Sequence, residues 1–458
     1  MSITVTQHNT ESFVEDKPAT PSRSSQRNDG SETRESDADY DLLQRDQNYR
    51  PSIVADMQHS DTNLNVTIDR FGFPMDENMD EKEHRKQVKK ENARLLKWQD
   101  MVFSKKSGGA SAEADNEIDQ QIHHWNVVKN HRKLKSRIRK GVPQQLRGTI
   151  WQNLSGARER RKIECARYGS KNLYNDLRGR KKSPYHDQIW KDINRTYRKN
   201  LAFGASQLAN ATANVNNDKK KNDSNGNNQK SGTQKFFKNV LQDTSVILTP
   251  QDLEKNATPA QMALYNVLKG FSLYRKDIGY CQGMQAVTAL LLMYMTEEEA
   301  FWVLASLADD TKYQMDNLWR PNMPAIQLRF YQMERLVKIT CPKLSSHFEK
   351  HGISSASMYQ ASQWFITIFL ATDMTFETIY RIYDIWLNEG YKSVFRFGIG
   401  FLKYFQKDLL NSDFEQMLEM FRTGGKLVDT DEYIKLSLSV KITHKQLEQY
   451  ERDFNNFK

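Results

Sequence analysis

Cysteine is scarce in this chain, and the few cysteines lie far apart. Cys165, Cys281 and Cys341 are distributed over 458 residues and form no C-x-x-C pair. Structural zinc sites and disulfide frameworks both need closely patterned cysteines, so the sequence indicates neither of them. Unpatterned thiols fit a reducing compartment. We therefore expect an intracellular protein without a metal site.

Long apolar runs are missing as well. No stretch reaches the roughly 18 apolar residues that a helix needs to cross a bilayer. Residues 1–5 offer neither the basic region nor the apolar core of a signal peptide. The chain also has no Gly-x-x-x-x-Gly-Lys-[Ser/Thr] loop, which cradles nucleotide phosphates in other proteins. We expect a soluble, cytoplasmic protein that does not itself bind a nucleotide through such a loop.

Charge is abundant but unevenly distributed. The chain has 67 Lys and Arg against 57 Asp and Glu, which gives a formal net charge of +10. Residues 1–80 contain 7 basic and 16 acidic residues, so the rest of the chain contains 60 basic against 41 acidic residues. A basic body of this kind could face nucleic acid, an anionic membrane or an acidic protein surface. Charge alone does not choose among these partners.

Two stretches are too polar to form a packed core. Residues 1–65 are rich in Ser, Asp, Glu, Asn and Gln, and residues 205–234 consist largely of Asn, Lys, Asp, Ser and Gly. Such segments cannot bury enough apolar surface to offset the entropy that is lost on folding. We predict a disordered acidic tail and a disordered low-complexity insertion, both of which act as tethers.

Apolar residues in the rest of the chain recur mainly at helical spacing. We predict a docked arm at residues 66–106, a helical domain at residues 118–425 that contains the insertion, and a C-terminal helical tail at residues 426–458. The short apolar run Phe365–Leu370 could pass for a strand, but the segments around it are helical in period. The predicted fold class is therefore all-α, with a single domain.

Three local signals predict helix boundaries. Thr296 and Glu299 have the spacing of a capping box, in which side chain and backbone satisfy each other at a helix start. Gly390 follows the apolar pattern of residues 375–387 and predicts the end of that helix. Pro143 suits the first position of the helix that follows it, because its missing N–H has no partner there in any case.

One loop is placed where chemistry can be presented. Gln282 follows Tyr280 and stands between Gly279 and Gly283, ahead of an almost uniformly apolar segment at residues 284–295 that predicts a buried helix. Loops held by rigid elements are favoured sites for function. The alternative is that Gln282 merely caps the helix and Tyr280 merely packs.

A second motif places two opposite charges one helical turn apart. Ile189 and Ile193 fall on one face of a predicted helix, and Asp192 and Arg195 are neighbours at i, i+3. Asp192 can therefore hold a guanidinium that projects from the helix end. The alternative is an ordinary surface ion pair. The basic run at residues 133–140 predicts a solvated helix face rather than a nucleic-acid contact, because no aromatic or base-reading pattern accompanies it.

Together these landmarks resemble the TBC domain of Rab GTPase-activating proteins. Ile189-x-x-Asp192-x-x-Arg195 is similar to the family's arginine-finger motif, and Tyr280-Cys281-Gln282 is similar to its glutamine-finger motif. The resemblance implies that Arg195 and Gln282 act on GTP bound to a partner. Asp192 would set Arg195, and Tyr280, with its two flanking glycines, would support the loop.

Two further segments add to the resemblance. Gly141 to Trp151, which includes Arg147, resembles the segment at the start of the family's domain, and Arg381 to Asp384 resembles a late landmark. The resemblance implies structural roles for Arg147, Trp151, Arg381 and Asp384.

The similarity extends over residues 69–410, and the run Asp69–Phe73 points to one subgroup. That subgroup includes the growth-hormone-regulated TBC proteins and the fungal TBC proteins of polarised secretion. One position departs from the family, which often has a proline two residues after the threonine that follows its arginine. Arg198 stands there, and it is an alternative candidate for the finger.

The resemblance implies a GTPase activator that is not itself a hydrolase. Its partner would be a Rab-family small GTPase in the GTP form, which would bind the nucleotide and Mg²⁺, so no cofactor is expected in this chain. Transient peripheral association with secretory or plasma membranes, and a role in vesicle transport, exocytosis and polarised growth, are implied by the same resemblance. No nucleic-acid partner is expected. The alternative is a catalytically silent TBC-like scaffold that binds a small GTPase.

Overall fold

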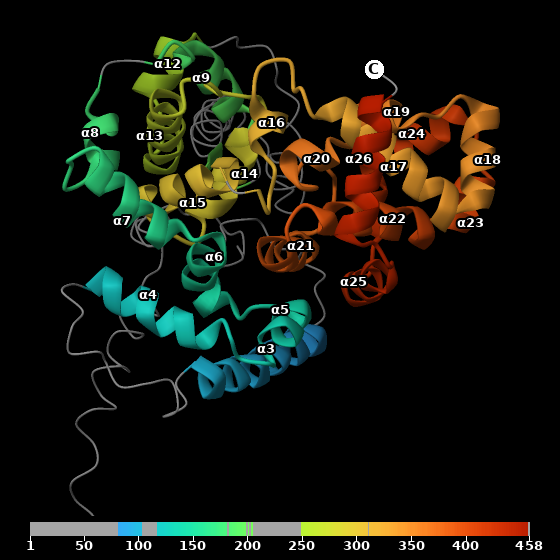
Figure 1. Cartoon of the computed structure of the whole chain (residues 1–458), viewed down its shortest axis with the longest axis horizontal. Helices are drawn as coiled ribbons and strands as arrows, with labels where there is room; N and C mark the ends of the chain where they lie inside the picture. The colour runs from blue at the N-terminus through green and yellow to red at the C-terminus, as the bar shows by residue number, and fades with distance from the viewer. Residues whose placement is uncertain are drawn as a thin grey trace, which may run out of the picture. The chain divides into compact units, whose positions relative to one another are not determined.

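The structure is a computed structural model, and it describes residues 81–102, 117–180, 183–197, 200, 203–204, 249–309 and 311–456 (Figure 1). Every regular element within these residues is a helix, which confirms the all-α prediction. The predicted acidic tail, the predicted insertion and Arg198 lie outside the described residues. The limits predicted for the separate parts of the chain stay predictions.

The helices up to the middle of the chain are mostly short. They are α3 (Glu81–Val102), α4 (Glu117–Val128), α5 (Leu134–Lys140), the 3₁₀ turn η2 (Gln144–Leu146), α6 (Arg147–Ser155), α7 (Ala157–Arg167), α8 (Leu173–Arg178), α9 (His186–Asn194), α12 (Pro250–Lys255), α13 (Pro259–Tyr274), α14 (Met284–Leu292), α15 (Glu297–Asp309) and α16 (Asp316–Trp319).

A second series of helices follows from residue 326 onward. They are α17 (Ile326–Thr340), α18 (Pro342–His351), α19 (Ser355–Ser362), α20 (Trp364–Thr367), α21 (Phe376–Glu389), α22 (Lys392–Tyr404), α23 (Gln406–Leu410), α24 (Phe414–Thr423), the 3₁₀ turn η3 (Gly424–Leu427), α25 (Thr430–Ser439) and α26 (His444–Asn456).

Helix α13 is the centre of the first series, where it packs against α8, α9, α14 and α15 (Figure 1). Thr258 and Gln261 form a capping box at its start, and Pro259 occupies the first helical position. Leu264, at 0% exposure, illustrates how little of its apolar surface meets solvent. A helix apolar on several sides needs neighbours on several sides, which explains its central position.

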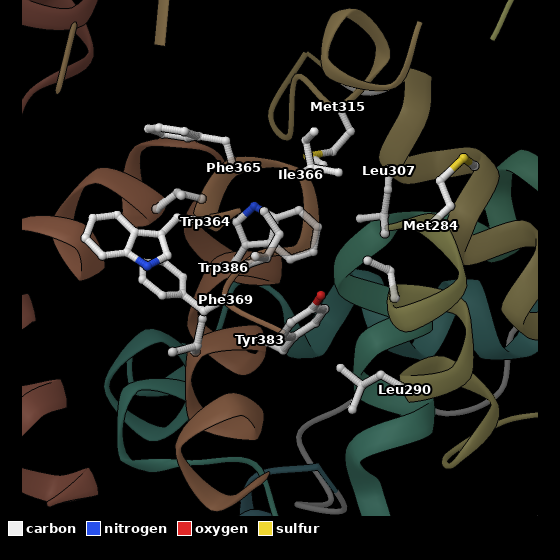
Figure 2. Close-up of a cluster of buried hydrophobic side chains, with 14 of the residues drawn as sticks. Met284, Leu290, Leu307, Met315, Trp364, Phe365, Ile366, Phe369, Tyr383 and Trp386 are labelled. Carbon is white, nitrogen blue, oxygen red and sulfur yellow. The ribbon is translucent and has the colours of Figure 1, made fainter. Parts of the chain in front are cut away.

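Helix α14 meets the second series through α20. Figure 2 shows Met284 and Leu290 of α14 near Ile366 of α20 and Tyr383 of α21, all of which belong to one buried apolar cluster. Buried aromatic side chains contribute a large part of core stability. The loop that precedes α14 therefore leads into a helix that is fixed by neighbours on both sides.

The C-terminal helices pack against earlier helices of the fold. Helix α25 packs against α22, and α26 packs against α17. Tyr433 and Leu447 are fully buried in the same core as the rest of the domain. Gln332 of α17 donates a hydrogen bond of 3.0 Å to the Leu447 carbonyl. Residues 426–456 are thus an integral part of the fold, because their apolar faces are covered by α17 and α22.

Two predicted helix boundaries are confirmed and a third is wrong. The Glu299 amide bonds to Thr296 Oγ1 at 3.3 Å and the Thr296 amide bonds to Glu299 Oε2 at 2.8 Å, which completes the capping box. Gly390 is the C-cap of α21, with φ +76°. Pro143, however, precedes the 3₁₀ turn η2 and is not the first residue of an α-helix. The α-helix itself begins at Arg147, four residues after Pro143.

The apolar run Phe365–Leu370 is neither a strand nor a regular helix. A single turn, α20, is followed by Ile368 and Phe369 at φ +48° and +67°, and Gln363 before it has φ +51°. Left-handed conformations are costly for such residues, above all for a β-branched isoleucine. The turn persists because Ile368 and Phe369 are buried, at 1% and 0% exposure.

Asp384 of α21 joins α21 to the start of the domain from a fully buried position. Its carboxylate accepts hydrogen bonds from the Val142 amide at 2.8 Å, Trp151 Nε1 at 2.8 Å and Arg147 Nε at 3.1 Å. Arg147 also contacts the ring of Tyr294, with 5.3 Å between the guanidinium carbon and the ring centroid. Three of the four predicted structural residues therefore meet in one buried cluster.

Arg381 lies apart from that cluster. Its guanidinium donates to Asp431 Oδ1 of α25 and to the Arg139 carbonyl of α5, both at 2.9 Å. The Asp431 side chain remains 56% exposed and also pairs with Lys90 of α3. Helix α3 further buries Trp98, at 1% exposure. Arg381 thus ties α21 to α5 and α25 near the packed α3.

Asp384→Ala should lower the free energy of unfolding by about 3–5 kcal/mol, because it leaves the buried Arg147 without its counter-charge. The matched control is Asp431→Ala, which removes a half-exposed carboxylate from Arg381 of α21. We expect the control to cost no more than about 1 kcal/mol. Urea unfolding of both variants measures the difference, and equal losses would contradict the central role of Asp384.

Candidate functional site

Helix α9 presents Arg195 at its C-terminal end. Ile189, Trp190 and Ile193 are buried at 0–1% exposure and fix the helix on α13 and its neighbours. The Arg195 amide closes the last turn on the Asp192 carbonyl at 3.2 Å. Because the helix ends at this residue, the Arg195 side chain projects from the protein surface and is 47% exposed.

Asp192 pairs with Arg195 from the buried side of the guanidinium. Its Oδ1 lies 2.5 Å from Arg195 Nη2, and its own side chain is only 6% exposed. The pairing that the i, i+3 spacing predicted is therefore present, and it is partly buried on the carboxylate side. A carboxylate fixed in this way restricts the guanidinium without covering it.

The second oxygen of the same carboxylate accepts a hydrogen bond from the loop that contains Gln282. Tyr280 donates its hydroxyl proton to Asp192 Oδ2 at 2.7 Å. Burial, and next the negative charge of Asp192, raise the pKa of Tyr280 well above its usual value. The hydroxyl therefore stays protonated and remains a donor at any physiological pH. One buried carboxylate thus connects both predicted motifs.

Gln282 lies in the loop between α13 and α14, as predicted, and its side chain is exposed. Within the described residues the side-chain amide of Gln282 makes no hydrogen bond, so both its oxygen and its nitrogen face solvent. The backbone around it is fixed: the Gly279 amide bonds to the Arg275 carbonyl at 2.7 Å, and the Gly283 amide bonds to Gln285 Oε1 at 2.7 Å. A free amide on a fixed backbone is suited to contact a group on another molecule.

Both glycines beside the motif are required by conformation and by space. Gly279 has φ +68° and Gly283 has φ +108°. A methyl group on Gly279 would overlap the ring of Tyr185, and one on Gly283 would lie 2.8 Å from Ile366 Cγ2. The loop therefore rests directly on α20 and on the segment before α9. The supporting role of Gly279 and Gly283 stays a prediction.

Gly279→Ala should cost more stability than Gly169→Ala. Both glycines have left-handed φ values, +68° and +61°, but nothing lies within 4 Å of a methyl group on Gly169. The control should lose about 1–2 kcal/mol for the backbone conformation alone. Gly279→Ala should lose a further 1–3 kcal/mol, roughly, for the overlap with Tyr185. Urea unfolding tests this, and equal losses would show that the Tyr185 ring yields freely.

An ion network that was not predicted from the sequence stabilises the start of this loop. Arg275 Nη2 lies 2.7 Å from Asp277 Oδ2 and 2.8 Å from Asp316 Oδ1 of α16. Arg320 reaches the same two carboxylates at 2.7 and 2.9 Å. The hydrogen bond from Arg275, offset in part by burial, lowers the pKa of Asp277 to about 2. The i, i+4 spacing of Asp316 and Arg320 was the one signal available in the sequence.

Cys281 contributes no reactive thiolate to the loop. Burial, and next the charge of Asp192, raise the pKa of its thiol to about 11. A neutral thiol is a poor nucleophile and a poor metal ligand. All three cysteines are free, and the described part of the chain contains no cluster of three or more side chains that could hold a metal ion. The exposed chemistry of this surface is that of Arg195 and Gln282.

None of the helices within the described ranges is both long and apolar enough to cross a bilayer.

Comparison with known families gives one match. A model of the Rab-GTPase-TBC domain matches residues 201–410 of the chain. Gln282 lies within this segment, and Arg195 lies shortly before its start. The match therefore covers the loop of Gln282 and the helices that support it, including α13, α14 and α20.

Several curated proteins are similar over most of this chain. It is 30% identical over 345 residues to the human Ecotropic viral integration site 5 protein homolog, covering 74% of this chain and 34% of the relative. It is 30% identical over 339 residues to the Caenorhabditis elegans Rab GTPase-activating protein eat-17, covering 73% and 31%. It is 27% identical over 396 residues to the GTPase-activating protein GYP5 of Eremothecium gossypii, covering 82% and 39%. The chain thus spans about a third of the length of these relatives.

A solved structure of a TBC domain is similar in fold to this chain. The TBC domain of a Chlamydomonas flagellar RabGAP superposes with a TM-score of 0.52 and 21% identity, covering 81% of this chain and 99% of that chain. At this level of identity the likeness establishes the helical architecture alone.

Proposed function

We propose that the chain belongs to the family of proteins with a TBC-type Rab GTPase-activating domain, and that it accelerates GTP hydrolysis by a Rab-family small GTPase. The match to the model of the Rab-GTPase-TBC domain and the similarity to a Rab GTPase-activating protein support this proposal. The chain is not itself a hydrolase in this proposal. The partner, in its GTP form, binds the nucleotide and Mg²⁺, and this chain supplies Arg195 and Gln282 in trans. The curated relatives named above as GTPase-activating proteins support the proposal.

Arg195 is suited to stabilise the transition state of phosphoryl transfer. Charge spreads over the oxygens of the transferring phosphoryl group, and an arginine supplied in trans is worth about 10³- to 10⁵-fold in rate. That corresponds to roughly 4–7 kcal/mol of activation barrier. The guanidinium of Arg195 is half-exposed, with Asp192 behind it, so its free N–H groups can face a partner.

Gln282 is suited to orient the attacking water. A neutral side-chain amide can accept a hydrogen bond from the water through its oxygen, while its nitrogen donates a hydrogen bond to a nearby acceptor. The Gln282 side chain is exposed and its backbone is fixed on either side. Within the described residues no other group forms a hydrogen bond with its side-chain amide. The two residues together would supply positioning and charge, which are the main requirements of GTP hydrolysis.

The observation that carries the proposal is the shared carboxylate of Asp192. It binds Arg195 through one oxygen and Tyr280 through the other, at 2.5 and 2.7 Å. Tyr280 is two residues from Gln282. Arg195 and Gln282 therefore project from two elements, helix α9 and the loop before α14, and Asp192 connects these elements through its ion pair with Arg195 and its hydrogen bond with Tyr280. An ordinary surface ion pair has no reason to include a buried tyrosine of a second loop.

A panel of GTP-loaded Rab proteins tests the proposal. Phosphate release is measured for each with and without this chain, under single-turnover conditions. We expect strong acceleration for at least one Rab. Binding to a GTP-loaded Rab without faster phosphate release would identify the silent scaffold instead, and acceleration of none would overturn the proposal.

We also propose that the protein visits secretory membranes transiently, in support of exocytosis or polarised secretion. The subgroup resemblance supports this site of action. Lys133, the N-cap of α5, and Lys135 and Lys140 within that helix are exposed. A basic residue near an anionic leaflet contributes about 1 kcal/mol. Sedimentation with vesicles should show binding to phosphatidylserine-containing vesicles that weakens with salt and is lost with neutral ones. Equal binding to both would contradict the electrostatic part.

A further inference from the structure

We propose that Gln285 is the positioning residue that couples Arg195 to Gln282. This inference rests on the proposed GTPase-activating function and adds to it a residue outside both finger motifs. Gln285 lies in the first turn of α14, and its side chain is directed back toward the loop. It is 8% exposed, so it has no direct access to a partner protein.

A single amide oxygen makes the connection. Gln285 Oε1 accepts the Gly283 amide proton at 2.7 Å, which fixes the backbone directly after Gln282. The same oxygen lies 3.0 Å from the Tyr280 hydroxyl oxygen, so the single proton of that hydroxyl is shared in a three-centre hydrogen bond between Gln285 Oε1 and the closer Asp192 Oδ2, at 2.7 Å. Gln285 therefore contacts both residues that flank the Cys281–Gln282 dipeptide.

The hydrogen bonds form one continuous path between the two exposed groups. From Arg195 the path runs through the carboxylate of Asp192 to the hydroxyl of Tyr280, then through Gln285 to the Gly283 amide. Every member except Arg195 is buried. Buried polar networks that are fully satisfied fix their members in one arrangement.

The chemistry of the linking residue follows from its partners. Both the Gly283 amide and the Tyr280 hydroxyl are donors, so the link must be an acceptor with two lone pairs. A carboxylate would place a second negative charge close to Asp192, whereas an amide oxygen accepts both bonds without that repulsion. Glutamine is the residue that reaches this point from α14 and remains neutral.

Gln285→Met is the test, because methionine keeps the length of the side chain and removes the oxygen. The matched control is Gln261→Met. Gln261 is likewise a buried glutamine in the first turn of a core helix, but its partners are the Thr258 amide and the Phe203 carbonyl. Steady-state kinetics with the Rab identified by the panel separates kcat from KM. Gln285→Asn, which withdraws the oxygen by one methylene, is the second variant.

We expect Gln285→Met to lower kcat by about 10- to 100-fold with KM nearly unchanged, because small misplacements of catalytic groups cost rate rather than binding. Gln261→Met should keep the wild-type kcat even if its melting temperature falls by a similar amount. Equal kcat values for wild type and Gln285→Met, or a change confined to KM, would overturn the inference.

Amide hydrogen exchange gives a second readout that needs no Rab. The Gly283 amide should exchange faster in Gln285→Met than in the wild type, with the centre of α14 unchanged, and Gln261→Met should leave it as it is. Unchanged exchange at Gly283 would overturn the positioning role even with an active wild type. Failure of the proposed function looks different, because the wild type would then accelerate no Rab while exchange at Gly283 still responded.

Discussion

Arg195→Ala should lower the rate of Rab-bound GTP hydrolysis by about 10³- to 10⁵-fold while leaving the fold intact. The side chain is 47% exposed, and within the described part of the chain its ion pair is with Asp192, so its loss removes little packing. The charge that it neutralises exists mainly in the transition state, so binding of the GTP-loaded Rab should change much less than turnover. Single-turnover phosphate release and binding to a GTP-locked Rab measure the two effects separately.

Arg195→Lys should lose nearly as much, because an ammonium cannot reproduce the planar fork of donors. Lys191→Ala is the matched control: it removes an exposed positive charge from the last turn of the same helix and should have a mild effect. Arg198→Ala decides between the two candidate arginines. If it abolished phosphate release while Arg195→Ala remained active, the finger would be Arg198, and Asp192 would lose its role.

Sequence periodicity was sufficient for the elements that carry the site. The apolar runs on either side of Gln282 predicted two core helices, and α13 and α14 stand there. The i, i+3 spacing predicted that Asp192 would pair with Arg195, and it does. Both inferences succeed because they depend on residues within one or two helical turns of each other.

The contacts between distant segments could not be predicted. Tyr280 and Asp192 are 88 residues apart, and neither period nor composition indicates that their side chains meet. The same holds for the bond between Arg275 and Asp316, 41 residues apart. These contacts depend on how α9 and α16 pack around the loop, which is a property of the tertiary fold.

The segment after α20 shows a different limit. Ile368 has φ +48°, although β-branched residues rarely adopt a left-handed conformation. Local propensity favours a strand at this position, but burial among aromatic side chains outweighs it. The carbonyl of Thr367, one residue earlier, accepts a hydrogen bond from the Tyr383 hydroxyl at 3.0 Å. Such strain is tolerated only where the surrounding core fixes the backbone.

Gln282→Ala should also lower the hydrolysis rate by orders of magnitude, because the attacking water loses the group that orients it. The side chain makes no hydrogen bond within the described residues and lies on the surface, so stability should stay within about 0.5 kcal/mol of wild type. Gln251→Ala, which removes an exposed glutamine from α12, is the control of matched chemistry and should be active. Wild-type turnover by Gln282→Ala would show that the partner orients its own water.

The double variant Arg195→Ala, Gln282→Ala distinguishes cooperation from independent action. Groups that act on one transition state are not additive, so the double variant should lose less than the product of the two single losses. Asp192 and Tyr280 connect Arg195 to the loop that contains Gln282, which strengthens the expectation that the two groups act on one transition state. Single-turnover rates of the four proteins form the cycle. A loss equal to the product would mean that arginine and glutamine work separately, and the hydrogen-bonded path between them would then have a structural role alone.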